Sequence, residues 1–210
     1  MSIGQETLQP QKGAKPSRGI LARLGRDRKG TASIEFAMLA LPFFLVIFAS
    51  IETFVAFYGD QLLANATETM ARKIRTGEIT FKRGKPATDM DEAKFRQAFC
   101  DEIAVLMKCS ATEATLASKL YIDVRSVTDL TQFPVFIPRT GVSSSSDLNT
   151  ADLKFAPGGP GSFNVMRAYY RWSVITDVVR PFVTNLRPAG ASMPKDYLMV
   201  STTTFRTESE

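Results

Sequence analysis

The longest run of apolar residues lies near the start of the chain, from Thr31 to Tyr58. Its only charged residues are Glu35 and Glu52, and every position between them is uncharged. A helix rises about 1.5 Å per residue, so this run is long enough to cross a hydrocarbon core of about 30 Å. It is too long for a signal peptide and lacks a small-x-small cleavage site followed by a polar break. We therefore expect a retained transmembrane helix over residues 31–58.

The helical pattern continues past the apolar run. Apolar residues recur there at three- and four-residue spacing, which is the stripe of an amphipathic helix: Leu63, Ala66, Met70 and Ile74. Gly77 follows as a C-cap. The pattern predicts one helix from about residue 31 to 76, whose second half, residues 59–77, packs on a soluble domain. Pro42 cannot donate a backbone hydrogen bond, so we expect a bend there.

Residues 78–210 carry weaker and mixed signals. An apolar stripe predicts a helix over about 91–107, with Asp89 and Glu92 as a capping pair. Alternating or β-branched positions predict three strands, and a short helical turn is expected near Pro181: the strands are residues 119–128, 163–177 and 197–205. The long irregular stretch 129–162 is expected to be a functional or disordered surface loop. The expected fold is α+β, a long N-terminal helix packed on a small antiparallel sheet with one further helix.

The charge is unevenly distributed. Residues 1–30 hold seven basic and two acidic side chains, which accounts for the whole formal net charge of +5. Because basic residues stay on the cytoplasmic side, we expect a cytoplasmic arm over 1–30 and a periplasmic domain after a single pass through the inner membrane. The basic excess lies only beside the apolar helix, without stacking aromatic residues, so we expect no nucleic-acid partner.

The composition argues against an enzyme. The chain has no histidine, which removes the commonest general base and the commonest ligand of catalytic metals. A membrane-tethered hydrolase would then need a Ser-Lys pair or paired carboxylates. The pairs Asp91-Glu92 and Asp101-Glu102 are adjacent in sequence and do not face each other on a helix. We expect no catalytic residues, no cofactor and no metal.

The two cysteines, Cys100 and Cys109, would lie in an oxidising compartment, where a disulfide is the usual state. Along an uninterrupted helix they would be about 13 Å apart, too far to bridge. A bond therefore requires the helix to end near Leu106–Lys108 so that the chain can fold back. Two separate buried thiols are the alternative.

The junction between the basic arm and the apolar helix resembles a type IV prepilin processing site. The pattern consists of Gly30, the small residues Thr31 to Ser33, then Glu35-Phe36 and an early Pro42 in the apolar run. In detail it is similar to the TadE-like family of minor pseudopilins in the tight-adherence (Flp) pilus system. The chain's closing residues, Phe205 to Glu208, also look like the family's ending. The likeness is strong over residues 26–75 and looser elsewhere.

The resemblance implies a structural role. A prepilin peptidase would cut between Gly30 and Thr31, and the Glu35 carboxylate would pair with the Thr31 ammonium of a neighbouring subunit. Glu35 and Phe36 would then set the register in which helices assemble. The implied partners are other pilins or pseudopilins, the prepilin peptidase, assembly platform proteins and membrane lipid, with incorporation into an extracellular pilus.

Simpler interpretations stay open at each position. Glu35 would otherwise sit in the headgroup region beside the positive helix N-terminus. Gly30 would otherwise be a flexible joint, and Glu52 is expected to be a solvated interfacial residue. The leader is longer than many prepilin leaders. The alternative function is a permanently anchored periplasmic adaptor or binding protein that is neither processed nor built into a filament.

Overall fold

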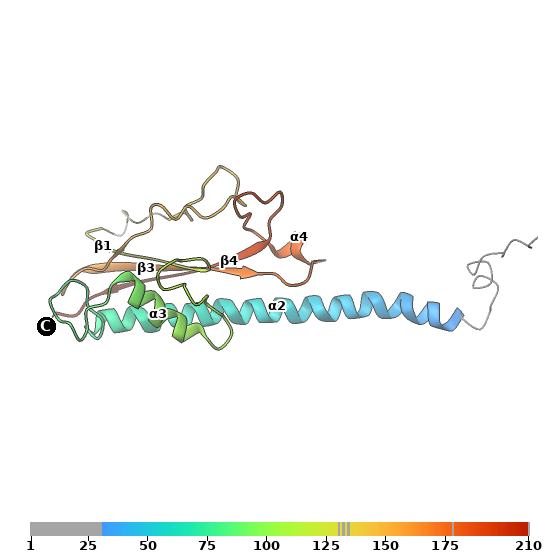
Figure 1. Ribbon diagram of the computed structural model, residues 1–210, viewed down its shortest axis with the longest axis horizontal. Helices are drawn as coiled ribbons and strands as arrows, with labels where there is room; N and C mark the ends of the chain where they lie inside the picture. The colour runs from blue at the N-terminus through green and yellow to red at the C-terminus, as the bar shows by residue number, and fades with distance from the viewer. Residues whose placement is uncertain (1–30, 130, 132, 134, 178, 210) are drawn as a thin grey trace, which may run out of the picture. The chain divides into compact units, whose positions relative to one another are not determined.

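The computed structural model describes residues 31–129, 131, 133, 135–177 and 179–209 of the chain (Figure 1). The expected arm over residues 1–30, including Gly30, lies outside the described residues. The chain divides into two compact units, Met1–Val46 and Ile47–Glu210. The described part of the first unit is the beginning of helix α2, and the second unit holds the rest of α2 and all other elements.

Helix α2 extends over Thr31–Arg75, close to the expected bounds. Arg72, Lys73 and Arg75 in its last turn favour the carbonyl end of the helix dipole. Gly77 follows with a φ of 78°, the left-handed conformation that glycine adopts at low cost when a helix ends. Over the described residues, α2 is the one helix that is long and apolar enough to cross a membrane, as a single-pass anchor would require.

The second unit contains a four-stranded mixed sheet of order β2-β1-β3-β4. Its strands are β1 (Leu120–Val127), β2 (Phe155–Ala156), β3 (Phe163–Ser173) and β4 (Asp196–Arg206). The three long strands are antiparallel, as expected, while the short β2 pairs with β1 in parallel and was not predicted. The α+β class is therefore confirmed, with a mixed sheet in place of a purely antiparallel one.

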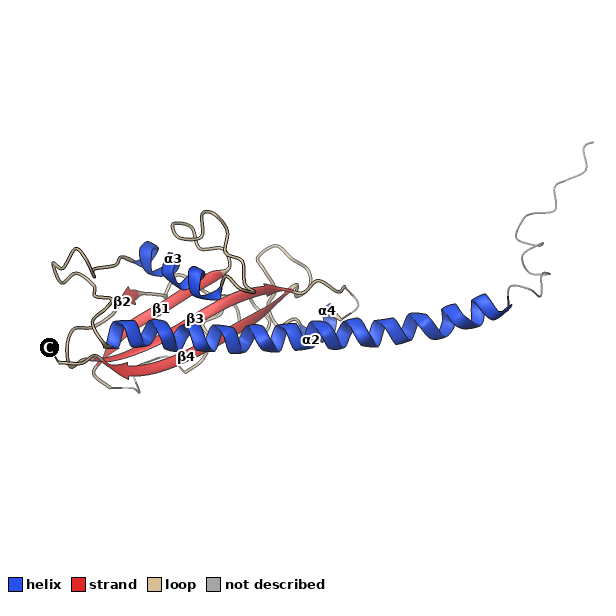
Figure 2. Cartoon of the chain, turned by 90° about the horizontal axis from the view of Figure 1, so that it is seen from below, coloured by secondary structure: helices blue, strands red, loops and turns tan. Residues whose placement is uncertain are grey.

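One face of the sheet is covered by helices. Figure 2 shows α2 and the shorter α3 (Glu92–Ile103) lying across the same face. The core between them joins residues of both helices to residues of all three long strands, among them Met70, Phe99, Val124, Met166 and Met199. The amphipathic stripe of α2 therefore covers the sheet as the sequence predicts.

The opposite face is covered by loops. Tyr169 on β3 and Leu198 on β4 pack there against Leu148 and Leu186, which come from segments without regular structure. Central residues of β3 are consequently buried in an unbroken run, in place of the alternation expected for a half-exposed strand. The described part of the 129–162 stretch thus contributes to a second core.

Helix α3 is shorter than expected and is capped differently. Its N-cap is Asp91, whose carboxylate accepts the Lys94 N–H at 2.8 Å. Asp89, expected to cap the helix, accepts the Thr80 hydroxyl and the backbone N–H groups of Arg83 and Lys85. It closes the preceding turn, because a carboxylate there can satisfy several amides at once.

Candidate functional site

The N-terminal part of α2 presents apolar side chains outward. Thr31 is the first residue of the helix, and Glu35 and Phe36 are exposed on its first two turns. Large apolar side chains remain more than one-third exposed along this part of the helix: Ile34, Phe36, Met38, Leu39, Leu41, Phe43, Phe44, Leu45, Val46, Phe48, Ile51, Phe54, Phe57 and Tyr58. Such a surface is disfavoured in water and suits a lipid or protein surround.

Pro42 lies inside α2, which continues through it from Thr31 to Arg75. Proline has no N–H to donate to the carbonyl four residues earlier, that of Met38. The bend expected at Pro42 stays a prediction.

The C-terminal part of α2 is buried on one side. The residues of this row are less than one-tenth exposed: Leu63, Ala66, Thr67, Met70, Ala71 and Ile74. Gly59 begins the row where the helix approaches two core methionines, since a Cβ at this position would lie 3.0 Å from Met199 Cε and 3.2 Å from Met107 Cε. One helix thus carries two surfaces, an exposed apolar one up to Tyr58 and a buried one that begins at Gly59.

Polar contacts attach α2 to the rest of the second unit along its length. The Tyr197 hydroxyl donates to Asp60 Oδ2 at 3.2 Å, and the Thr203 hydroxyl donates to Glu68 Oε2 at 2.6 Å. Nearer the helix end, Lys73 pairs with Glu102 of α3, and Arg75 pairs with Glu208. We call these contacts, together with those of Glu52, the helix seam.

Glu52 was expected to be a solvated interfacial residue; its carboxylate is instead hydrogen-bonded to the domain, while its place at the interface stays a prediction. Its Oε1 accepts the Ile175 N–H at 2.7 Å, and both carboxylate oxygens lie 3.3 Å from the Thr176 nitrogen. The carboxylate therefore holds the chain segment that leaves β3.

Asp60 and Tyr197 form a half-buried pair within the seam. Burial raises the pKa of Asp60, although the Tyr197 hydrogen bond opposes this effect. Burial and the neighbouring Asp60 raise the pKa of Tyr197. The tyrosine hydroxyl therefore stays protonated at neutral pH and acts as a donor.

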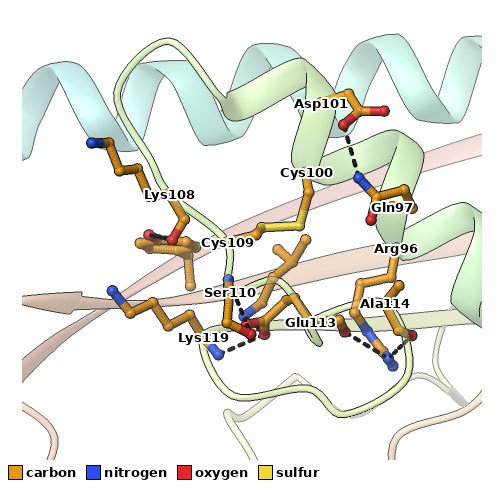
Figure 3. Close-up of a disulfide and its surroundings, with 12 residues drawn as sticks. Arg96, Gln97, Cys100, Asp101, Lys108, Cys109, Ser110, Glu113, Ala114 and Lys119 are labelled. Atoms are coloured by element: carbon orange, nitrogen blue, oxygen red, sulfur yellow. Dashed lines mark hydrogen bonds between the residues drawn. A yellow bond between two sulfur atoms is a disulfide. The ribbon is translucent and has the colours of Figure 1, made fainter.

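The two cysteines lie where the chain turns back after α3. Helix α3 ends at Ile103, and Cys100 Sγ is bonded to Cys109 Sγ with the Cα atoms 5.9 Å apart (Figure 3). The helix ends at Ile103, earlier than the end expected near Leu106–Lys108. The residues after it form the turn that brings Cys109 back toward Cys100. The disulfide links α3 to the segment that leads into β1.

Glu113 organises that segment and was missed at the sequence level. Its carboxylate accepts the backbone N–H groups of Ser118, Lys119 and Leu120 at 2.6–2.9 Å, and the Ser118 hydroxyl at 2.6 Å. Burial alone would raise the pKa of Glu113, but these hydrogen bonds outweigh it and lower the pKa to about 2. A buried carboxylate with so many donors holds the start of β1 in place.

The acidic pairs considered as catalytic candidates have structural contacts. Asp91 caps α3, Glu92 pairs with Arg96, and Glu102 pairs with Lys73. Within the described ranges, no group of three or more Asp, Glu or Cys side chains is placed to hold a metal ion.

A sequence signal for part of the seam was available. Extending the Leu63–Ile74 stripe backward in steps of three or four residues leads to Asp60, Ala56 and Glu52, which lie on the same side of the helix. Two acids continuing an apolar stripe indicate polar partners on the packed domain. Glu113 offered no comparable signal, because its partners are backbone amides.

Comparison with known families identifies one segment. Residues 30–72 match the family model of the TadE-like protein. The match begins at Gly30, contains Glu35, Phe36 and Pro42, and ends within the buried part of α2. It confirms the resemblance over this TadE-like segment and leaves residues 73–210 outside it. Neither the curated proteins nor the solved structures yield a match to the chain.

Proposed function

We propose that this protein is a minor pseudopilin of the tight-adherence pilus system that supports pilus biogenesis and surface adhesion. The observation that carries the proposal is the TadE-like match, which starts at a glycine followed by an exposed apolar helix with a glutamate five residues on. The known family role is structural, in agreement with a surface suited to helix packing. The partners would be other pilins, assembly platform proteins and the prepilin peptidase.

The proposed topology follows from charge and helix length. Residues 1–30 form a cytoplasmic leader, 31–58 cross the inner membrane, 59–77 continue the helix, and 78–210 complete the periplasmic domain. The basic side chains before residue 30 keep that end in the cytoplasm.

Processing at Gly30 would create the assembly surface. Cleavage before Thr31 frees an amine at the start of the helix, and the Glu35 carboxylate of a second subunit can pair with it. Two opposite charges brought together in an apolar bundle no longer oppose assembly, although each alone would be costly there. Phe36, exposed beside Glu35, would add apolar contact to the same register.

Two substitutions test this mechanism in cells. Gly30→Val should leave the leader attached, because a bulky side chain at the residue before the cut blocks access of the peptidase to the backbone. Gly13→Val, in the same arm but away from the cut, should still allow the leader to be removed. Glu35→Gln should permit cleavage but abolish piliation. If both variants have the same size as the wild-type protein in cells and both give full piliation, the pseudopilin mechanism is contradicted.

A permanently anchored periplasmic adaptor is the second candidate. It is favoured by the attachment of α2 to the domain through the helix seam, which an anchor would use equally well. Mass spectrometry of the mature N-terminus separates the two: Thr31 as the first residue supports the pseudopilin, and an intact leader supports the anchor.

A further inference from the structure

The segment between β3 and β4 begins at a point fixed to α2. The described residues 174–177 and 179–184, which we call the tethered segment, include the short helix α4 (Arg180–Val183). The Ile175 and Thr176 amides donate to Glu52, and the Arg180 N–H donates to the Thr176 carbonyl at 3.1 Å. The backbone of the tethered segment is therefore held at the level of Glu52 along the helix.

This segment nevertheless turns large apolar side chains to the outside. Ile175 is 84% exposed and Phe182 is 86% exposed. Phe57, five residues after Glu52 on α2, is also exposed and lies beside this segment. These apolar side chains come from two elements that lie at the same position along the axis of α2. A group of large apolar side chains exposed together to water is unfavourable and marks a surface for a partner.

A pocket lies between the tethered segment and the helix. It is about 310 Å³ in volume, and its lining is mostly apolar: Ala56, Phe57, Trp172, Val174, Val179 and Val183, with Glu52, Thr53, Asp60 and Tyr197 at its polar positions. Such a lining suits apolar groups of a lipid, because the carboxylates of Glu52 and Asp60 are both hydrogen-bonded within the domain.

The position of Glu52 along the proposed membrane span indicates what covers this surface. Glu52 precedes Tyr58, the last residue of the proposed span, by six positions, and this corresponds to about 9 Å along the helix. Interfacial elements bury their apolar side about 5–10 Å into the boundary between headgroups and acyl chains. Asp177 and Arg180 form an ion pair in this segment. Charged side chains favour the headgroup layer over the hydrocarbon core, so such a segment would lie in the interface without spanning the membrane.

We propose that the tethered segment rests in the membrane interface, with Ile175 and Phe182 inserted among the lipids and Glu52 as the tether. The domain would then be held against the bilayer at two places, the helix and this segment. The inference rests on the proposed topology, in which α2 crosses the membrane.

The test uses the full chain in nanodiscs of phosphatidylethanolamine and phosphatidylglycerol, some carrying bromine near the acyl carbonyls. Trp172 is the chain's single tryptophan, so Trp172→Phe gives a silent background. Phe182→Trp is compared in that background with Phe136→Trp, whose native side chain is equally exposed at 85% but lies on the loop-covered face of the sheet. Phe43→Trp reports on the span itself.

Brominated lipid should reduce the emission of the Phe182→Trp variant about twofold while leaving Phe136→Trp unchanged, as insertion at the interface requires. Aqueous iodide should quench Phe136→Trp and spare Phe182→Trp. Adding Glu52→Ala should weaken the lipid quenching of Phe182→Trp, because the tether is lost.

Each contrary result has a distinct meaning. If Phe43→Trp is quenched by lipid but Phe182→Trp behaves like Phe136→Trp, the span stands and the interfacial segment is overturned. If Phe182→Trp is shielded from iodide without lipid quenching, protein covers it, and the lipid proposal is again overturned. Failure of Phe43→Trp to be quenched would remove the proposed topology and this inference together.

Discussion

At the scale of single residues, Glu113 is an acid that serves as a backbone acceptor. Three consecutive amides and two serine hydroxyls, those of Ser110 and Ser118, point to one carboxylate that is 1% exposed. Hydrogen bonds to a charged acceptor are stronger than neutral ones, and a buried donor left without its acceptor is costly.

Glu113→Gln should therefore lower the free energy of unfolding by about 2 kcal/mol, because an amide is a weaker acceptor and brings donors of its own. Urea unfolding of the detergent-solubilised chain, followed by Trp172 fluorescence, measures the change. Glu78→Gln, at an exposed position, is the control and should leave the midpoint where it is. Equal midpoints for the two variants would contradict the role given to Glu113.

The same carboxylate predicts a pH dependence. Its pKa is about 2 in the folded chain against an ordinary value of 4.5, so the folded state favours the charged form. The stabilisation is complete above about pH 5 and is lost as the pH falls from about 4.5 toward 2. Wild type and Glu113→Gln should accordingly converge in stability at acid pH. A constant difference between them from neutral pH down to about pH 2 would be the contrary result.

At the scale of elements, α2 changes its surroundings along its length without changing its secondary structure. Met70 is fully buried against the sheet, whereas Met38 is 74% exposed. Met70→Ala should lower the free energy of unfolding by about 2–5 kcal/mol through lost burial and a cavity. Met38→Ala, the same chemical change on the same helix, should leave it unaltered. Denaturant titration of both in one detergent makes the comparison, and similar losses would contradict the division of the helix.

The Cys100–Cys109 disulfide also stabilises the fold at the scale of elements. A link across nine positions restricts the unfolded chain, so replacing both Cys100 and Cys109 by serine should cost about 2–3 kcal/mol. Reductant should destabilise the wild type by a similar amount and leave the double variant unchanged. Loss of stability in the double variant on adding reductant would point to another origin.

The elements differ in how far the sequence reveals them. The apolar run, the stripe from Leu63 to Ile74 and the alternation in β1 predicted the helix and the long strands, because burial periodicity is local information. Strand β2, two residues long, could not be predicted, since it exists only through its pairing with Val124 and Arg125. The loop-covered second face was missed for the same reason, because Leu148 and Leu186 meet Tyr169 only in three dimensions.

The site shows the same division. Gly30, Glu35, Phe36 and Pro42 could be proposed from the sequence because their spacing along one segment carries the family pattern, and that segment is the one that matches the family model. The hydrogen bonds of Glu52, expected to be a solvated interfacial residue, were missed because its donors, Ile175 and Thr176, lie far away in sequence and are backbone groups that any residue could supply.

At the scale of the whole molecule, the proposed topology predicts where each end of the chain lies. Alkaline phosphatase fused after Glu210 should be active, since the enzyme needs an oxidising compartment for its disulfides. The same enzyme fused before Met1 should be inactive. Activity measured in intact cells provides the test, with expression of both fusions checked by immunoblot. An inactive C-terminal fusion at normal expression would contradict a periplasmic domain.

The helix seam also has a mechanical consequence. Its contacts start at Glu52 and end at Arg75, where the Glu208 N–H donates to the Arg75 carbonyl at 3.0 Å. A force applied along the helix axis would act on all of these contacts in shear at the same time. It would not break them one after another. Under the proposed topology, tension on the membrane helix would therefore reach the domain through all of these contacts together.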